Sequence, residues 1–191
     1  MKHSAHPRPT SYIRSAVRLL ASQSGGLAAI EFAIILPLML LLYLGSFEIA
    51  QAVSLKRQVA LTASTVANIV TQYATISKTG EMPDILDASS VVLTPYPVSN
   101  AIVVVSCITV DGNGKATVTW SQALPSGDAR STGQPVTLPP GLDVPNTSVV
   151  LGETTYAYSP LMDFMHIGTL NLYSSVYMSP RSSSGTIVLT P

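Results

Sequence analysis

The sequence predicts an α+β fold, in which a long N-terminal transmembrane helix continues into a small antiparallel β-sheet domain. Two observations carry this prediction. Sixteen consecutive residues, 32–47, have no charged side chain, and eleven of the fourteen prolines follow residue 80, among short runs of β-branched residues. The first pattern is typical of a membrane helix, and the second is typical of strands joined by turns.

The overall composition excludes several classes of protein. Only 10% of the 191 residues are charged and the mean hydropathy is +0.38, whereas soluble domains carry about 25% charged residues. This argues against a disordered chain and against a generic cytoplasmic enzyme. The formal net charge is zero, so the molecule as a whole lacks the electropositive surface that binding of nucleic acid requires.

The charges are distributed unevenly around a single membrane span, which we predict at Leu27–Ile49. A helix needs about 20 residues to cross the hydrocarbon layer. Residues 1–30 carry four basic side chains and no acidic one, whereas the part of the chain after Arg57 carries eight acidic and four basic side chains. Because basic flanks stay in the cytoplasm, Arg14 and Arg18 favour an N-in, C-out orientation, although Lys56 and Arg57 weaken this preference.

A processing signal precedes the span. Residues 1–26 form a basic leader that ends in Gly26, and the apolar helix that follows has a glutamate as its fifth residue. The pattern of Gly26-Leu27 followed by Glu31-Phe32 resembles the processing site of type IV prepilins. The resemblance implies that a prepilin peptidase cuts after Gly26 on the cytoplasmic face, which leaves Leu27 as the first residue of the mature chain.

The resemblance extends along the helix. Residues 25–61, with Pro37, Gly45 and Glu48 at fixed offsets, are similar to the TadE/TadG family of tight-adherence pilus assembly proteins, and in particular to its shorter, TadE-like members. Membership implies a pilin-like fold and a pseudopilin or minor-pilin role in the assembly of Flp (Tad, type IVb) pili and in surface adhesion. It implies no cofactor.

The family resemblance also implies a location and a set of partners. The location is the inner (cytoplasmic) membrane, and also the pilus or the cell surface if the subunit is incorporated. The partners are prepilin peptidase, other pilin-like subunits, the Tad inner-membrane assembly platform and the lipid bilayer.

Two residues of the span have alternative interpretations. A carboxylate inside a membrane is costly, and Glu31 can pair with the α-amino group that processing frees at Leu27 of a neighbouring subunit, since a matched ion pair is favourable in low dielectric. Glu31 can instead be a solvated residue at the interface. Pro37 removes one backbone hydrogen bond and would kink the helix where neighbours compensate, or it is an ordinary membrane-helix proline.

Beyond the span the helix is expected to continue to about Tyr73, within a segment that we place at residues 50–76. Apolar residues at a spacing of three or four predict one buried stripe on it: Val59, Ala63, Val66, Val70 and Tyr73. Gly80, followed by Pro83, is expected to end the helix.

Residues 77–191 are expected to form the extracytoplasmic α+β domain. Three runs read as strands, Ala101–Val110, Thr147–Tyr158 and Leu170–Met178, and the first is joined by a turn at residues 111–114 to a fourth strand. In that fourth strand Ala116, Val118 and Trp120 alternate with polar residues, which predicts that all three face one side. Residues 124–146 are rich in proline and are expected to form a surface loop.

The sequence offers little catalytic chemistry. His3 and His6 lie in the leader, so His166 and Cys107 alone cannot build a zinc site, and Cys107 reads as a buried small apolar residue. Residues 111–115 begin like a calcium loop but have lysine at a ligand position, so we interpret them as a turn. We predict neither an enzyme nor a metal site. Three carboxylates after the helix read as a solvated loop, with a weak ion site as the alternative: Glu81, Asp84 and Asp87.

Two other function classes stay open. One is a secreted or periplasmic protein with a signal peptide cut after Ala52, because Ala50-Gln51-Ala52 has the small-x-small form of such a site. The other is a membrane-anchored periplasmic binding domain whose ligand would lie near the proline-rich loop 124–146. The N-terminus of the mature chain separates the first of these from the pilus subunit, and loss of pili on deletion separates the second.

Overall fold

The computed structural model describes residues 24–125, 128–160, 168–182 and 185–191. The chain divides into two units, of which the first ends at Ile49 and the second begins at Ala50. The predicted α+β class is confirmed: a long apolar helix is followed by an antiparallel sheet of four strands.

The first unit consists, in its described part, of the beginning of helix α2, which runs over Ser24–Thr71. This helix is long and apolar enough to cross a membrane, and none of the residues in its most apolar stretch is buried. Pro37 lies inside this helix, where its ring leaves one backbone hydrogen bond unmade. The leader residues 1–23, with His3, His6, Arg14 and Arg18, lie outside the described residues.

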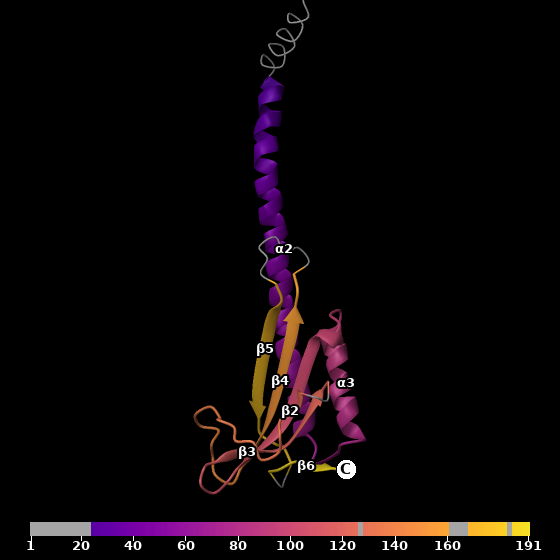
Figure 1. Cartoon of the computed structure of the whole chain (residues 1–191), viewed down its shortest axis with the longest axis vertical. Coiled ribbons are helices and arrows are strands. Elements are labelled where there is room, and N and C mark those ends of the chain that lie inside the picture. Colours follow the sequence, from indigo (N-terminus) through magenta and orange to yellow (C-terminus); the bar gives the residue numbers. More distant parts are fainter. Residues whose placement is uncertain (1–23, 126–127, 161–167, 183–184) are drawn as a thin grey trace, which may run out of the picture. The chain divides into compact units, whose positions relative to one another are not determined.

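The second unit is built on a sheet with the strand order β3-β2-β4-β5, and every neighbouring pair is antiparallel. Figure 1 shows these strands side by side. The bounds are β2 Ala101–Val110, β3 Ala116–Leu124, β4 Ser148–Tyr158 and β5 Leu170–Met178. The predicted strands and the turn at residues 111–114 are therefore confirmed.

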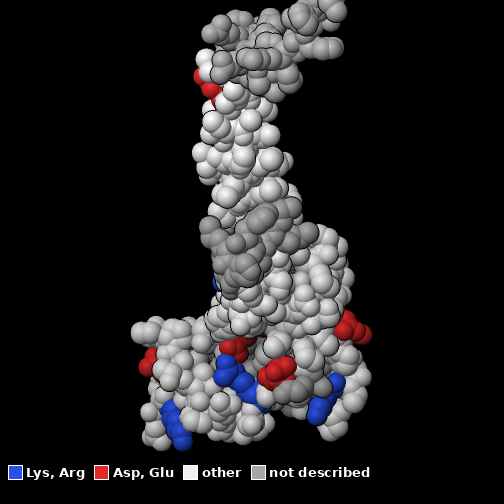
Figure 2. All heavy atoms as spheres, turned by 45° about the horizontal axis from the view of Figure 1, so that its top comes forward, with Lys and Arg blue, Asp and Glu red and all other residues white. Residues whose placement is uncertain are grey.

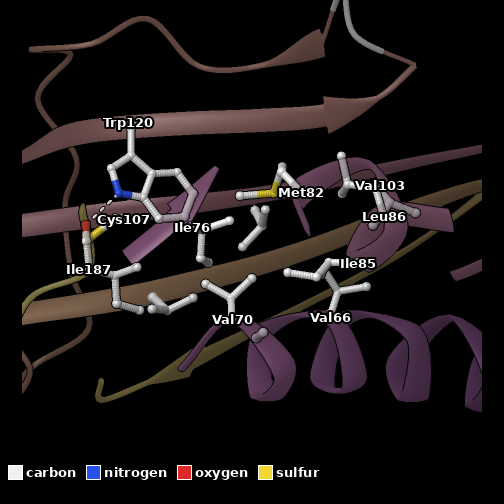
Figure 3. Packing of buried hydrophobic residues seen from close by; sticks show 13 residues of the cluster. Val66, Val70, Ile76, Met82, Ile85, Leu86, Val103, Cys107, Trp120 and Ile187 are labelled. Carbon is white, nitrogen blue, oxygen red and sulfur yellow. Dashed lines mark hydrogen bonds between the residues drawn. The ribbon is translucent and has the colours of Figure 1, made fainter. Parts of the chain in front are cut away.

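Two helical segments cover one face of this sheet. The later part of α2 and helix α3, Glu81–Leu93, contribute to a cluster that also contains side chains of β2, β3 and β4. Figure 3 shows Val66 and Val70 of α2 directed toward Ile76 and the neighbouring core residues. The cluster comprises Val66, Ala67, Val70, Ile76, Met82, Ile85, Leu86, Val103, Val105, Cys107, Trp120, Val150 and Ile187.

The predicted stripe on α2 is confirmed over four of its five residues. Val59, Ala63, Val66 and Val70 are each at most 1% exposed, but Tyr73 is 36% exposed. The prediction was wrong for Tyr73 because the helix ends at Thr71. There the backbone N–H of a distant residue, Arg181, donates to the Thr71 carbonyl at 2.9 Å, and the chain leaves the helix direction.

A second, two-stranded sheet was not predicted. Strand β1, Thr75–Ser77, pairs in parallel with β6, Val188–Thr190. The residue before β6, Ile187, is 2% exposed, and its carbonyl accepts a 2.8 Å hydrogen bond from the indole N–H of Trp120, drawn as a dashed line in Figure 3. The segment after β5 thus completes the core.

The segment that carries Glu81, Asp84 and Asp87 is helix α3 and not the solvated loop that we expected. Proline is tolerated in the first turn of a helix, so Pro83 does not prevent helix formation. The Glu81 carboxylate accepts a 2.8 Å hydrogen bond from the Ser77 N–H, and this bond lowers the pKa of Glu81. Residues at helical spacing are buried against the sheet: Met82, Ile85, Leu86, Ser89 and Leu93.

Strand β3 departs from the simple alternation that we expected. Cys107 lies opposite Trp120, but Ile108 lies opposite Val118, so Thr119 is an extra residue in β3. Such a bulge reverses the side to which the preceding residues point. Ala116 therefore packs with Ile108 on the face away from the helices, whereas Trp120 joins the core beneath them.

The proline-rich loop packs on the sheet more closely than a simple surface loop. Val136 and Leu138 lie against the buried residues of the outer face, the face away from the helices. The Val136 N–H donates to the Ala116 carbonyl at 3.1 Å and the Gly133 N–H donates to the Val118 carbonyl at 2.7 Å. These bonds cover the free edge of β3 over its first residues, which protects it from pairing with another strand.

Candidate processing and assembly segment

The residues predicted to direct processing all lie at the start of α2. Gly26, Leu27, Glu31 and Phe32 fall in its first turns, and Leu27 and Phe32 are 64% and 61% exposed. Residues four apart in a helix lie on the same face. The helix therefore places the backbone of Leu27 and the side chain of Glu31 on one face, one turn apart.

The bond predicted to be cut, between Gly26 and Leu27, lies in the first turn of α2, which begins at Ser24. A peptidase that binds an extended substrate must unwind this turn. Glycine lowers helix stability by about 1 kcal/mol relative to alanine, and two glycines, Gly25 and Gly26, precede the bond. The local sequence therefore keeps the cost of unwinding low at this point.

The remaining helix features lie further along the same exposed stretch. Pro37 cannot donate a hydrogen bond to the carbonyl of Ala33. A Cβ atom added to Gly45 would meet nothing within 4 Å, so no contact within the chain requires glycine there. Glu48 is only partly exposed.

The first unit presents an almost continuous apolar surface. In Figure 2 this stretch of helix is white over nearly all of its length. Monomeric soluble proteins rarely expose apolar patches larger than a few hundred Å², so this surface requires lipid or neighbouring helices. Its large apolar residues other than Leu44 are exposed by 38% or more: Leu27, Ile30, Phe32, Ile34, Ile35, Leu36, Leu38, Met39, Leu40, Leu41, Leu42, Tyr43, Phe47 and Ile49.

Residues 26–68 match the model of a family described as TadE-like protein. The segment is TadE-like. The likeness covers less than a quarter of the chain. The match begins at Gly26 and ends at Asn68, so it includes the exposed apolar stretch and part of the buried stripe. No curated protein and no solved structure shows a significant match.

The TadE-like segment continues without a break through Ala52, the predicted signal-peptidase position. The Tyr96 hydroxyl donates to the Gln51 side-chain oxygen at 3.2 Å, and Ala52 packs against a cluster that contains Leu55 and Val59. A cut after Ala52 would remove both contacts from the second unit. The geometry therefore disfavours the signal-peptide interpretation.

The other chemical candidates do not form a site among the described residues. No group of three His, Cys, Asp or Glu residues in that part of the chain could hold a metal ion, and His166 lies outside it. Cys107 is buried, and this burial raises the pKa of its thiol to about 11, so it is a poor nucleophile at neutral pH.

One polar constellation was missed by the sequence analysis. On the outer face of the sheet Arg130 pairs with Glu153 at 2.7 Å, and the Tyr173 hydroxyl donates to the same carboxylate at 2.8 Å. These residues line a hollow of about 210 Å³ beside the proline-rich loop. Because the Glu153 charge is already matched, this constellation serves first to fasten the loop to the sheet. Only the three-dimensional register brings Arg130 and Glu153 together, so no sequence pattern signalled it.

Proposed function

We propose that this chain is a membrane-anchored, pilin-like subunit, a pseudopilin or minor pilin, that is needed for assembly of Tad pili and for surface adhesion. The anchor would be the span Leu27–Ile49, inserted N-in and C-out in the inner membrane. Prepilin peptidase would cut after Gly26, and the mature subunit would engage other pilin-like subunits and the Tad assembly platform.

One observation carries the proposal. The TadE-like match begins at Gly26, at the junction between the basic leader and the exposed apolar stretch of α2. A signal that is cut at this junction removes all the positive charge of the leader and leaves the apolar helix on the mature chain. That helix can then pack laterally with other helices in the membrane, where small differences in side-chain pairing select the partner.

The first experiment tests processing. We expect the mature chain to begin at Leu27, and we expect Gly26→Ala to leave the full-length precursor, because an added methyl group intrudes where the peptidase must approach the backbone. Gly45→Ala is the matched control, since it changes a glycine of the same helix where a Cβ meets nothing. The measurement is N-terminal sequencing of the protein recovered from membranes. A mature chain that begins at Val53 would establish the signal-peptide alternative instead.

The second experiment tests assembly and concerns Glu31. If Glu31 pairs with the freed amine of a neighbour, Glu31→Gln should still be cut and inserted, but its incorporation should fail, because an unpaired buried charge costs several kcal/mol. Glu48→Gln, at the other end of the span, is the control. Cross-linking to other pilus components, together with a count of surface pili, gives the readout.

The helix geometry gives Glu31 a second possible partner, the α-amino group of its own chain. Position 31 also lies one turn from the new amine of its own chain, so an internal pair would form in the isolated subunit. Wild-type cross-linking by Glu31→Gln would show that Glu31 does not select a neighbour, and the intermolecular pairing would be refuted.

A further inference from the structure

The four-stranded sheet protects only one of its two edges. The edge of β3 is covered by the proline-rich loop, in which the N–H groups of Gly133 and Val136 donate to β3. The other edge is β5, which Figure 1 shows as the outermost strand on its side. It pairs with β4 along its whole length without a bulge and contains neither proline nor a charged residue. It therefore lacks the features by which natural proteins keep an edge strand from pairing.

One hydrogen bond identifies the backbone groups that point outward from β5. In an antiparallel pair, the N–H and carbonyl groups of successive residues point alternately toward the paired strand and away from it. The Lys56 ammonium, from α2, donates to the Tyr173 carbonyl, so this carbonyl points away from β4. The backbone groups of Asn171, Ser175 and Tyr177, at alternate positions, point the same way. Among the described residues, only Lys56 bonds to this outward row.

The hydrophobic core reaches this edge and is incompletely covered there. On the side of the sheet that α2 covers, Leu172, Val176 and Met178 pack against buried clusters but are themselves only partly buried. Within the described chain no strand lies beyond them. An added strand would place every second side chain next to these three residues. Apolar side chains at those positions would remove more apolar surface from water.

The unmatched charges beside this edge are positive. Lys56 and Arg57 are both exposed, and β5 itself carries no charge. Glu153, in the neighbouring strand β4, is already paired with Arg130 and accepts from the Tyr173 hydroxyl. A second copy of β5 would bring another Lys56 to the same edge, and like charges oppose such a pairing. A strand that carries a carboxylate is instead complementary to this edge.

We propose that β5 accepts an extended segment of a different protein chain as an added strand, and that this segment carries an acidic residue beside Lys56. The backbone of the segment bonds to the outward row of β5, which is the usual mode of strand addition. The Lys56 ammonium leaves the Tyr173 carbonyl and pairs with the carboxylate of the segment. Lys56 thus covers the edge in the free subunit and selects an acidic partner. This surface goes beyond the proposed function, because it depends neither on processing nor on the membrane span.

The test uses the full chain in detergent micelles and a displayed library of random peptides of nine residues, the length of β5. We expect the selected peptides to contain an aspartate or glutamate and no central proline. Lys56→Glu should weaken their binding about ten-fold, as loss of one charge-assisted pair does. Lys115→Glu, at an exposed position of the turn between β2 and β3, is the control and should leave binding unchanged. A library without binders, or equal binding by the two variants, would overturn the proposal.

Exchanging the charges sharpens this test. A selected peptide whose acidic residue is replaced by lysine should bind poorly to the wild type and should regain its binding to Lys56→Glu, because the pair is restored with reversed signs. Failure of this exchange to restore binding would show that Lys56 does not select the partner.

A second arm tests the backbone contact. Ser175→Pro removes an outward N–H but no bond to β4, and edge strands tolerate proline at such positions. It should abolish peptide binding. Hydrogen exchange of the wild type gives an independent readout: the N–H groups of Asn171, Ser175 and Tyr177 should exchange fast in the free chain and slowly with a bound peptide. Unchanged exchange would refute strand addition. Self-association of the wild type that Ser175→Pro abolishes would show that β5 accepts a second copy, which refutes a different chain as the partner.

Discussion

Gly152→Ala is expected to destabilise the second unit, because the sheet and α2 touch at this glycine. A Cβ atom added there would lie 2.5 Å from the Ala63 carbonyl oxygen and 2.8 Å from the Ala67 Cβ. Neither neighbour is the end of a flexible side chain, so α2 must move away from β4. Overpacking of this kind costs about 1–3 kcal/mol. Alanine also lowers the conformational entropy of the unfolded chain, which stabilises the fold by about 0.4–1 kcal/mol. The net effect of the substitution is therefore still destabilising.

The assay is urea unfolding of the full chain in detergent, followed by the fluorescence of Trp120. This is the only tryptophan of the chain, and it is 5% exposed in the core that α2 covers. We expect a lower midpoint with little change in slope. A variant as stable as the wild type would refute the close approach of α2 to β4.

A double variant sharpens the test. Ala67→Gly removes the methyl group nearest to the new Cβ but leaves the Ala63 carbonyl in place, since that atom belongs to the backbone. We therefore expect Gly152→Ala with Ala67→Gly to recover little stability. Glycine in the helix also costs about 1 kcal/mol by itself. Full recovery in the double variant would show that the carbonyl contact does not exist.

Two further predictions concern the second unit. Arg130→Ala should lower the free energy of unfolding by about 1–3 kcal/mol, because it removes the cation that pairs with the carboxylate of Glu153, a residue that is 8% exposed. Lys115→Ala, at an exposed position, is the control. Equal urea midpoints for the two variants would contradict the prediction. Burial raises the pKa of the Cys107 thiol from 9.0 to about 11. Between these two pH values the thiol ionises in the unfolded chain but not in the folded chain, so the stability that the buried thiol contributes is complete below about pH 9 and is lost as the pH rises toward 11. The stability difference between the wild type and Cys107→Ala, measured by urea unfolding across this range, should therefore shrink with rising pH, and a constant difference would be evidence against the raised pKa.

The elements that the sequence predicted well are those fixed by local periodicity. The apolar run of α2, the strands Ala101–Val110 and Leu170–Met178, and the turn at Asp111 each carry their signal within a few neighbouring residues. The turn is closed by its own aspartate, whose carboxylate accepts from the N–H groups of Asn113 and Lys115 at 2.9 Å. Such local hydrogen bonding can be predicted from the sequence.

The missed elements depend on partners far away along the chain. Strand β1 exists because residues 188–190 pair with it, and three residues are too few for a periodic signal. The bulge at Thr119 depends on the register against β2. Helix α3 is the exception: Met82, Ile85, Leu86 and Ser89 repeat at helical spacing, but the sequence analysis interpreted the carboxylates of this segment as part of a solvated loop. The processing residues were found from the sequence through a family resemblance, and their roles stay predictions.

The pairing of β1 with β6 has a consequence for the order in which the second unit can fold. Thr75 and Val188 are partners, and every strand of the larger sheet lies between them in the chain. If the second unit is translocated as proposed, β1 emerges early and Ile187 emerges late. Closing a loop of this length is slow compared with forming a hairpin. The hydrophobic interior would therefore stay open to solvent until the segment around Ile187 has emerged, and a nascent chain stalled before that point should be cleaved readily by proteases on the far side.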